Sequence, residues 1–405
     1  MKVLSFGHLP SWAGGRQESG LANVIYQLAK HESSIPGIDI YLAATDSFIP
    51  MRQDGNLTIV GWTKGRLLLY ILFHPFQCYS SFLVLKNLKR RNPIAESFWG
   101  LFLKRVFLSR TLHNISPDVI HLHGPASVWY LDLVPASVKV ALTFHGMTGL
   151  DENLSDYRIL NEMERALFHS PRVDGVFFIC TKLVDLFVKE YGPNGKNNSV
   201  IFNSYDNSQF FLDKDNLSLP SNVTEDAVNG DKVSLYTVAS LSDLKGQLRV
   251  LVGIKNAANH NKFEYTCIGG DTDGYANELL KYAEENNLSF RYLGKMPPGE
   301  IREELMHAQY MIMPSSSEGF GLAYLEAIAC GVPVILPKDL PIAQESELIN
   351  DNNSIMLEDC SSKAITKVLN SLDKSKFNRV SVAETITAFS WDEIAVRYIN
   401  AYKQL

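Results

Sequence analysis

The sequence predicts a two-domain α/β protein in which each domain is a doubly wound, mostly parallel sheet covered by helices. Strand-like apolar runs alternate with helical patterns along the chain. Several runs lack polar alternation, as strands buried on both faces do. A stretch rich in Asp, Asn and Ser at 206–231 interrupts the alternation, which then restarts. The 405 residues are enough for two hydrophobic cores.

The first half of the chain supplies seven strand-like runs. They are KVLSF, IDIYLAA, LTIVGW, DVIHLH, VKVALTF, GVFFI and SVIF. Helical patterns such as GLANVIYQLAKHE and RILNEMERALFHS lie between them. We expect an N-terminal Rossmann-like domain over residues 1–205, followed by a linker at 206–231.

The second half repeats this build. Its strand-like runs are KVSLYTVA, FEYTCIGG, SFRYLG, YMIMPS and VPVIL, and its helical runs include YANELLKYAEEN, EIREELMHA and GLAYLEAIACG. We expect a second Rossmann-like domain over 206–385. The amphipathic end of the chain predicts a helix within 386–405 that packs back toward the N-terminal domain. Two such domains are expected to hold a ligand between the facing carboxyl ends of their strands.

Composition excludes several classes of protein. A formal charge of −6 argues against a general nucleic-acid binder. The five cysteines are scattered without metal-ligand or disulfide spacing, so we expect no metal and a reducing compartment. The first residues, MKVLSFGHLP, favour a strand over a secretory signal. A cytoplasmic location is therefore expected.

Residues 61–110 form a basic and apolar region. They contain nine Lys and Arg residues against Glu96 alone. The apolar stretch at 67–85 is interrupted by His74, Pro75 and Gln77, which disfavours a membrane-spanning helix. Cations interleaved with aromatic and aliphatic residues suit peripheral contact with the anionic inner face of the cell membrane. Helices packed on the core with a solvated basic edge explain the pattern equally well, and both interpretations stay open.

The block SSSEGFGLAYLEAIACG carries the clearest chemistry. It reads as a strand-to-helix loop in which Gly319 and Gly321 allow close approach of a ligand to the backbone. The free amides and the positive dipole end of the helix suit a diphosphate. Glu318 before the turn can accept hydrogen bonds from sugar hydroxyls, and Glu326 inside the helix can hold a vicinal diol.

This block resembles the E-x7-E motif of the retaining nucleotide-sugar glycosyltransferases of family 4, which have the GT-B fold. The resemblance covers essentially the whole chain. It implies that Glu318 contacts the hydroxyls of the donor sugar and that Glu326 holds the ribose. It also implies that backbone amides contact the sugar and phosphate at Gly319, Phe320, Gly321 and Leu322.

Residues of the first half extend the resemblance. Gly20 falls where the family has a glycine near the donor phosphate. His145 ends a strand where the family has a histidine at the donor sugar and phosphate. Gly15 and Arg16 belong to a loop expected near the acceptor. His121 and His123 share one face of their strand, and a structural role is favoured for both, with His123 as an acceptor-side candidate.

Residues of the second half complete the expected donor site. Lys245 matches a family lysine that binds the leaving diphosphate, but Ser240 stands where the family has an arginine. Arg16 and Arg249 are candidates to replace that cation. The backbone at Lys295 and Met296 is expected to pair with the nucleotide base. The glycine-rich strand end that includes Gly269 is expected to face the same site.

The resemblance implies a metal-independent, retaining hexosyltransferase with Glu318, His145 and Lys245 as its catalytic residues. The donor would be a nucleoside-diphosphate sugar, with UDP expected first and GDP second. The acceptor would be a hydroxyl of a glycan or a lipid-linked oligosaccharide in bacterial-type surface polysaccharide synthesis. The DTD triplet at 271–273 is interpreted as a loop. A nucleotide-sugar epimerase, another GT-B enzyme, or a non-catalytic sugar-nucleotide-binding module, raised by Ser240, remain alternatives.

Overall fold

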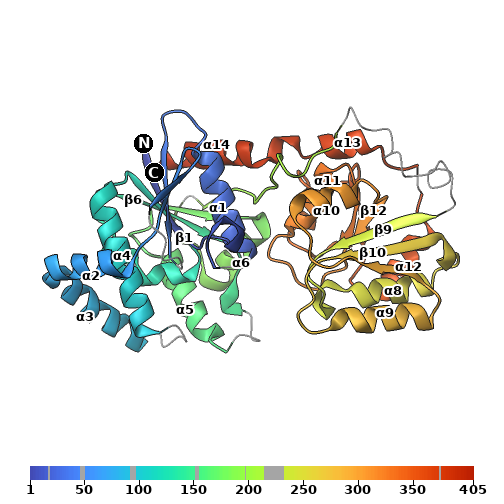
Figure 1. Cartoon of the computed structure of the whole chain (residues 1–405), viewed down its shortest axis with the longest axis horizontal. Helices are drawn as coiled ribbons and strands as arrows, with labels where there is room; N and C mark the ends of the chain where they lie inside the picture. Colours follow the sequence, from blue (N-terminus) through green and yellow to red (C-terminus); the bar gives the residue numbers. More distant parts are fainter. Residues whose placement is uncertain are drawn as a thin grey trace. The chain divides into compact units, whose positions relative to one another are not determined.

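The computed structural model describes residues 1–16, 19–45, 51–91, 97–150, 155–196, 198–213, 232–373 and 375–405. The chain divides into two compact units (Figure 1). Unit 1 comprises Met1–Asn203 and Trp391–Leu405, and unit 2 comprises Ser204–Ser390. The divisions therefore fall two and five residues from the predicted boundaries after 205 and 385.

Unit 1 is built on a sheet of eight strands in the order β3-β4-β2-β1-β5-β6-β7-β8. All neighbours are parallel except β3 and β4. The strands are β1 (Lys2–Gly7), β2 (Asp39–Ala44), β3 (Arg52–Asp54), β4 (Leu57–Val60), β5 (Val119–His123), β6 (Lys139–Phe144), β7 (Gly175–Phe178) and β8 (Asn198–Val200). All seven predicted runs form strands. The antiparallel edge strand β3 was not predicted, because its three polar residues carry no apolar pattern.

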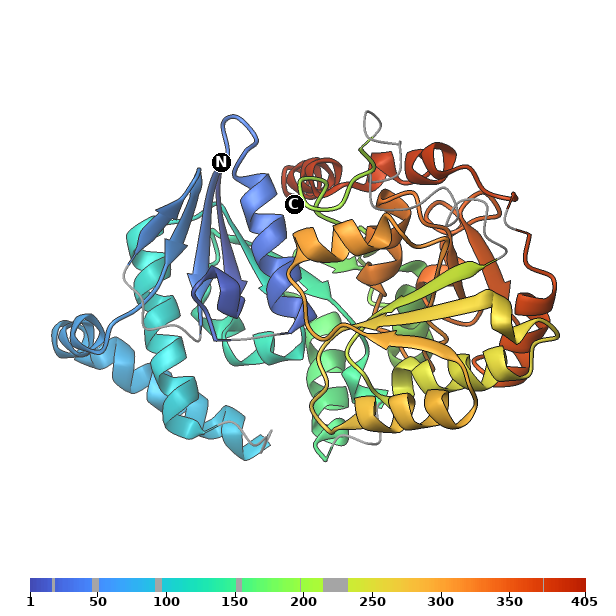
Figure 2. The same cartoon turned by 45° about the vertical axis from the view of Figure 1, so that its right-hand side comes forward.

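Helices cover both faces of this sheet. The helices of unit 1 are α1 (Gly20–Glu32), α2 (Lys64–Phe73), α3 (Pro75–Arg91), α4 (Phe98–Ile115), α5 (Tyr157–Phe168), α6 (Thr181–Tyr191) and α14 (Trp391–Tyr402), of which α2 and α3 pack on α4. Figure 2 shows α1 and α4 on opposite sides of the sheet. The last helix, α14, packs on α1 although more than 350 residues separate them in sequence.

Unit 2 is built on six parallel strands in the order β11-β10-β9-β12-β13-β14. The strands are β9 (Val233–Val238), β10 (Phe263–Ile268), β11 (Ser289–Tyr292), β12 (Tyr310–Ile312), β13 (Val334–Pro337) and β14 (Ser354–Leu357). The helices are α8 (Gln247–Lys255), α9 (Tyr275–Glu285), α10 (Pro298–Leu305), α11 (Leu322–Ala329), α12 (Ser362–Asn370) and α13 (Arg379–Glu384). The predicted fold class, two parallel-sheet α/β units, is confirmed.

The predicted linker does not begin as a linker. Phe210 and Leu212 are buried, and Tyr205 forms a β-bridge with Ser390, so the stretch up to residue 213 belongs to the packed body of unit 2. Burial of two large apolar side chains outweighs the polar composition around them. Residues 214–231 of the predicted linker lie outside the described residues.

One cation of the basic region at 61–110 is buried and not part of a solvated edge. Arg105 in α4 is fully buried and makes a bidentate pair with Asp132, at 2.7 and 2.6 Å. It also donates to the Ser81 hydroxyl at 2.9 Å and to the Trp129 carbonyl. Among the described residues, no single helix has the length and apolar content needed to cross a bilayer; the bent pair Gly65–Phe73 and Pro75–Arg90 reaches them only together.

Candidate active site

In unit 2, the predicted donor-binding residues follow four neighbouring strands. Because β11, β10, β9 and β12 are parallel neighbours, their carboxyl ends lie along one edge of the sheet. Ser240 and Lys245 follow β9, and Gly269 follows β10. Lys295 and Met296 follow β11, and the loop with Glu318 follows β12. The topology therefore brings these separate stretches to one edge, as expected for a ligand site of an α/β sheet.

The loop after β12 ends in an uncapped helix start. Gly321 is the N-cap of α11 with a φ of +97°, and no side chain caps the first amides of this helix. A Cβ at Gly321 would lie 2.7 Å from the Tyr324 ring, so only glycine fits this turn. The Phe320 side chain is buried beside this turn. Uncapped amides at a helix start suit an anion.

Lys245 and Glu318 form an ion pair at this edge. The Lys245 Nζ lies 2.6 Å from the Glu318 Oε1, and the two side chains are 24% and 9% exposed. The sequence predicted that both residues contact the same donor, but it did not predict that they form an ion pair with each other. The pair positions a cation and a carboxylate directly before the glycine turn.

Backbone contacts fix this pair. The Leu244 carbonyl accepts from the Ser316 amide at 2.8 Å and from the Ser315 hydroxyl at 3.2 Å, which joins the loop after β9 to the loop after β12. Arg249 donates to the Pro314 carbonyl at 3.1 Å and to Asp243 at 3.2 Å. These contacts hold Lys245 against Glu318.

Arg249 is one of the two cations that the sequence offers in place of the missing family arginine. Its guanidinium is engaged with the Asp243 carboxylate and with loop carbonyls. The sequence carries no signal for this role, because the acceptors are mostly backbone carbonyls that any residue provides. The Ser240 side chain itself is exposed, and its carbonyl accepts from the Gln247 side chain at 3.1 Å.

Gly269 occupies a position that excludes a side chain. Its φ is +152°, and a Cβ there would lie 1.9 Å from the Ala239 carbonyl oxygen. Its amide donates to the Gly294 carbonyl at 2.8 Å, which fixes the loop that carries Lys295 and Met296. Lys295 is exposed and Met296 is partly buried. The ends of β10 and β11 are thus tied through backbone atoms.

Glu326 has a raised pKa. Burial, and then the charge of Asp206, raise the pKa of this carboxyl to about 7. Sequence reasoning placed Glu326 inside the helix but missed Asp206, which comes from the stretch interpreted as a linker. A carboxyl with a pKa near 7 changes its charge in the neutral pH range, so any ligand contact that depends on this charge also depends on pH.

In unit 1, two histidines meet at the carboxyl edge of the sheet. His123 ends β5 and His145 follows its neighbour β6. The His123 Nδ1 lies 3.1 Å from the His145 Nε2, and the Ser5 hydroxyl lies 3.4 Å from the His123 Nε2. Burial lowers the pKa of His145 to about 4, and burial with neighbouring histidines lowers the pKa of His123 well below its usual value. Both rings are therefore neutral at pH 7, and the His145 Nδ1 is buried without a hydrogen-bond partner.

His121 belongs to a buried polar network behind these rings. Its Nε2 lies 2.7 Å from the Thr143 hydroxyl, and its Nδ1 lies 2.7 Å from the Tyr402 hydroxyl of α14. Tyr402 donates to Glu32 at 2.9 Å. Burial lowers the pKa of His121 to about 3 and raises the pKa of Glu32 to about 8. These satisfied contacts fit the structural role favoured for His121.

The loop after β1 carries the remaining predicted residues of unit 1. A Cβ at Gly15 would lie 1.8 Å from the Leu9 carbonyl oxygen, so this glycine lets the loop fold back on itself. Arg16 is exposed. Gly20 begins α1 with open space around it, and Ser19 caps the helix by accepting from the Ala22 amide at 3.2 Å.

The loop after His145 is fixed by a residue that sequence reasoning did not identify. Glu164 of α5 is fully buried and accepts from the Thr148 amide at 2.9 Å, the Thr148 hydroxyl at 2.7 Å and the Gly149 amide at 3.1 Å. Burial raises the pKa of this carboxyl. Its position inside a helical apolar pattern was the available signal, because a carboxyl placed there needs partners.

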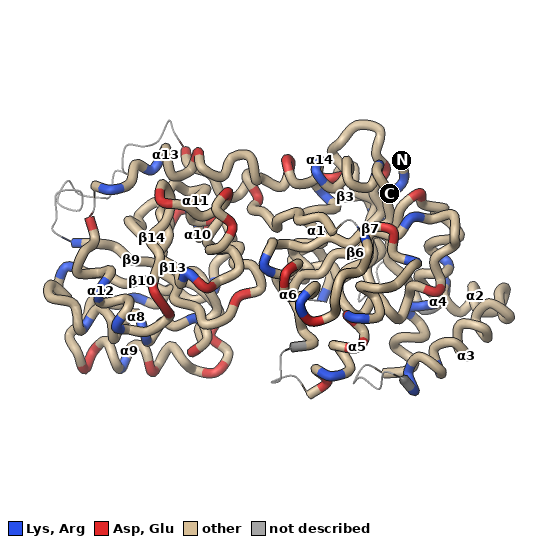
Figure 3. The backbone as a smooth tube through the Cα atoms, turned by 180° about the vertical axis from the view of Figure 1, so that it is seen from behind, with Lys and Arg blue, Asp and Glu red and all other residues tan. Residues whose placement is uncertain are grey.

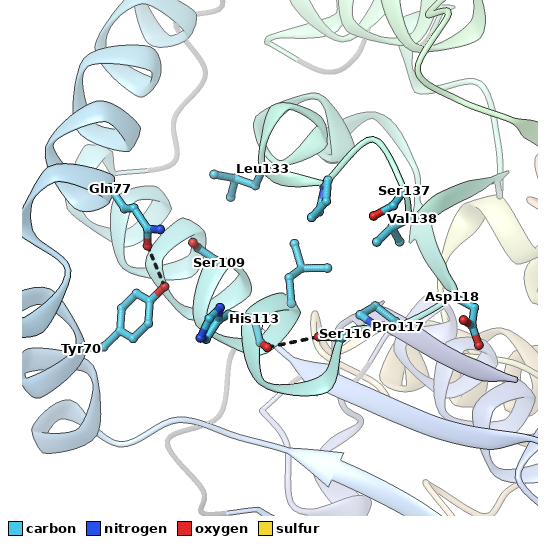
Figure 4. Close-up of a pocket in the computed structure, with 12 residues that line it drawn as sticks. Tyr70, Gln77, Ser109, His113, Ser116, Pro117, Asp118, Leu133, Ser137 and Val138 are labelled. Atoms are coloured by element: carbon cyan, nitrogen blue, oxygen red, sulfur yellow. Dashed lines mark hydrogen bonds between the residues drawn. The ribbon is translucent and has the colours of Figure 1, made fainter.

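Two further features bear on the site. Asp271 of the DTD triplet caps α9 by accepting from the amides of Tyr275 and Ala276, at 2.9 and 3.0 Å. The described side chains contain no group of three or more His, Cys, Asp or Glu residues arranged for a metal. A cavity of about 540 Å³ in unit 1, shown in Figure 4, lies beside the start of β5 and contains none of the predicted site residues.

Two family models match the chain. The model described as Glycosyltransferase Family 4 matches residues 19–209, and the model described as Glycosyl transferases group 1 matches residues 222–386. A curated relative, the O-antigen chain mannosyltransferase B of Escherichia coli, is 34% identical over 154 residues. That match covers 36% of this chain, and the chain spans only 39% of the length of that relative.

Solved structures share the fold over the whole chain. Sucrose-phosphate synthase from Thermosynechococcus elongatus superposes with a TM-score of 0.71 at 15% identity, covering 100% of this chain and 99% of that one. The Anabaena protein HepE, solved with UDP and glucose, superposes with a TM-score of 0.65 at 15% identity over 100% of both chains. Identities this low show the fold alone. Taken with the two family models, they show that the chain belongs to the family 4 glycosyltransferases of the GT-B fold.

Proposed function

We propose that the protein is a retaining glycosyltransferase that moves a hexose from a nucleoside-diphosphate sugar to a hydroxyl acceptor. The observation that carries the proposal is the Lys245–Glu318 pair directly before the uncapped start of α11. It offers a cation and helix amides to a diphosphate, and a carboxylate to the sugar beside it. Membership of the family supports the same reaction class.

In this reaction the bond between the anomeric carbon and the diphosphate oxygen breaks, and a bond to the acceptor oxygen forms on the same face. The acceptor proton passes to the leaving diphosphate, so neither a protein nucleophile nor a metal is required. Lys245 and the α11 amides stabilise the charge that develops on the diphosphate. Glu318 orients the sugar through its hydroxyls, and Glu326 holds the ribose.

His145 would serve as a neutral donor. If the Ser5 hydroxyl donates to the His123 Nε2, then the His123 Nδ1–H donates to the His145 Nε2. The unpartnered His145 Nδ1 then carries a proton that it can donate to an oxygen of the donor sugar or phosphate. The lowered pKa of both rings favours this uncharged arrangement.

The finer assignments are also proposals. UDP is the first nucleotide to test, supported by the UDP bound to the Anabaena protein, and GDP is the second. The Escherichia coli relative is named for O-antigen chain synthesis, which supports an acceptor in O-antigen-type polysaccharide synthesis, either a glycan or a lipid-linked oligosaccharide. Such an acceptor favours a cytoplasmic protein working at the inner face of the cell membrane.

Two measurements test the proposal. Melting temperatures with UDP, GDP and other nucleoside diphosphates should show a rise with one base, because a ligand that binds the folded state stabilises it. Radiolabelled donors of that base should then give a glycosylated acceptor with the anomeric configuration of the donor. Lys245→Met should weaken both effects. Sugar isomerisation without an acceptor would instead indicate an epimerase.

A further inference from the structure

The helix pair α2–α3 presents an apolar surface to solvent. The most exposed large apolar side chains of the described structure gather here: Leu72, Phe73 and Phe76 are 71%, 74% and 88% exposed. Other exposed residues of the surface are Leu68, Leu69, Tyr79 and Leu83, joined by Trp99 at the start of α4. A concentration of exposed apolar side chains of this kind marks a site of contact with a protein or a membrane.

The pair is held firmly on its other side. Leu67, Cys78 and Leu85 are buried, and both helices pack on α4. The Tyr70 hydroxyl donates to the Gln77 side chain at 3.2 Å across the bend, as Figure 4 shows. The buried Arg105 donates to Ser81 of α3 at 2.9 Å. The exposed apolar face is therefore a fixed feature of unit 1 and not a loose hairpin.

The charges around this surface have one sign. Residues 64–91 contain no Asp or Glu, and Figure 3 shows no acidic segment on the pair. Arg66 at the start of α2 and Lys86 and Arg90 near the end of α3 are exposed. The apolar side chains at the bend thus lie between cations at the two far ends. Lysine and arginine in this arrangement can keep their charges at lipid headgroups while neighbouring apolar groups enter the layer.

We propose that α2–α3 is a membrane-docking element whose bend inserts Leu72, Phe73 and Phe76 into the headgroup boundary of an anionic bilayer. This inference rests on the proposed function, because docking would bring the enzyme to a lipid-linked acceptor. The single sign of the charges favours an anionic bilayer as the partner. A second copy of the chain would bring like charges together at the same surface.

The topology connects this element to the site. α4 leads into β5 and runs antiparallel to it, so its first residues lie at the carboxyl edge of the sheet, the edge that carries His123 and His145. Phe82 of α3 packs edge-on against Phe98 at the start of α4, with ring centroids 5.1 Å apart. The cationic end of α3 is therefore near that edge of unit 1.

Co-sedimentation of the full chain with vesicles, without any nucleotide sugar, tests the inference. Wild type should bind vesicles of phosphatidylcholine with phosphatidylglycerol, bind phosphatidylcholine alone weakly, and lose affinity as salt rises. Phe73→Ser with Phe76→Ser should lower the partition coefficient at least tenfold. Lys86→Ser with Arg90→Ser should lower it about tenfold and flatten the salt dependence. Leu280→Ser with Val396→Ser, which removes two exposed apolar side chains elsewhere, should leave it unchanged.

Other outcomes would overturn the inference. Equal vesicle binding by wild type and the Phe73/Phe76 variant would exclude this surface. No vesicle binding, together with a dimer that the same variant dissociates in light scattering, would assign the surface to a second copy. Resistance of the bound protein to carbonate extraction would indicate a spanning segment. A melting shift with the nucleoside diphosphate, retained in the variants, separates failure of docking from failure of the proposed function.

Discussion

Replacing Glu318 by Gln should affect sugar transfer and nucleotide binding in opposite directions. The substitution keeps the size of the side chain and removes its charge. In the wild type the carboxylate lies 2.6 Å from the Lys245 Nζ, with only 9% of its side chain exposed. The same carboxylate is proposed to accept hydrogen bonds from two hydroxyls of the donor sugar. One group thus holds Lys245 in the free enzyme and the sugar in the complex.

The magnitudes follow from these contacts. A hydrogen bond to a charged group contributes about 1.5–3 kcal/mol, against about 1 kcal/mol for a neutral acceptor. Losing the charge at two sugar hydroxyls therefore removes about 1–4 kcal/mol, or about 5- to 1000-fold in kcat/KM. In the Glu318→Gln variant, Lys245 does not have to break an ion pair before it contacts the diphosphate. Because partly exposed ion pairs contribute about 1 kcal/mol, UDP without sugar should bind about threefold to tenfold more tightly.

Nucleotide-release kinetics with the full donor and calorimetric titration with UDP would measure the two effects. Lys245→Met should weaken UDP binding, which gives the opposite sign to Glu318→Gln. Glu264→Gln is the matched control, because it breaks an ion pair with Lys232 at the amino-end edge of the same sheet. The reasoning fails if Glu318→Gln keeps kcat/KM within a few-fold of wild type, or if UDP binding and transfer fall together.

Four further outcomes are expected. Ser240→Arg should raise kcat about tenfold by returning a cation to the leaving group, and a large loss in the same kinetic assay would show a site rebuilt around serine. UDP affinity measured by calorimetry should rise with pH through about 7 as Glu326 ionises. Asp206→Asn removes a nearby negative charge and should move that rise to lower pH. An unchanged midpoint of the pH dependence in this variant would contradict the assignment to Glu326. Gly269→Ala should cost about 3 kcal/mol or more and lower the melting temperature, because its Cβ would lie 1.9 Å from a carbonyl oxygen. Glu32 binds its proton more tightly in the folded state, with a pKa of about 8 against 4.5, so its contribution to stability is lost as pH rises between these values. The melting temperature of Glu32→Gln should therefore rise relative to that of wild type as pH increases across this range. A difference that stays constant with pH would contradict this reasoning.

The sequence by itself determined the fold class and the order of most elements. Strands buried on both faces leave apolar runs without alternation, and their helices leave a periodic pattern, so both signals are local. The E-x7-E block was readable for the same reason, because Glu318, the glycine turn and Glu326 lie within nine consecutive residues. Elements with little apolar pattern, such as β3, escaped prediction.

The tertiary structure decided which distant groups meet. Residues 65 to 120 positions apart in the sequence interact in unit 2. Lys245 pairs with Glu318, Arg249 donates to the Pro314 carbonyl, and the charge of Asp206 acts on Glu326. The network from Glu32 through Tyr402 to His121 joins the two ends of the chain. The structure also separated Arg105, which is buried and paired, from the exposed cations of the same basic region. Such contacts depend on strand order and on which face of an element is covered, and a local pattern contains neither; the sequence could therefore name the chemical groups of this site but not their partners.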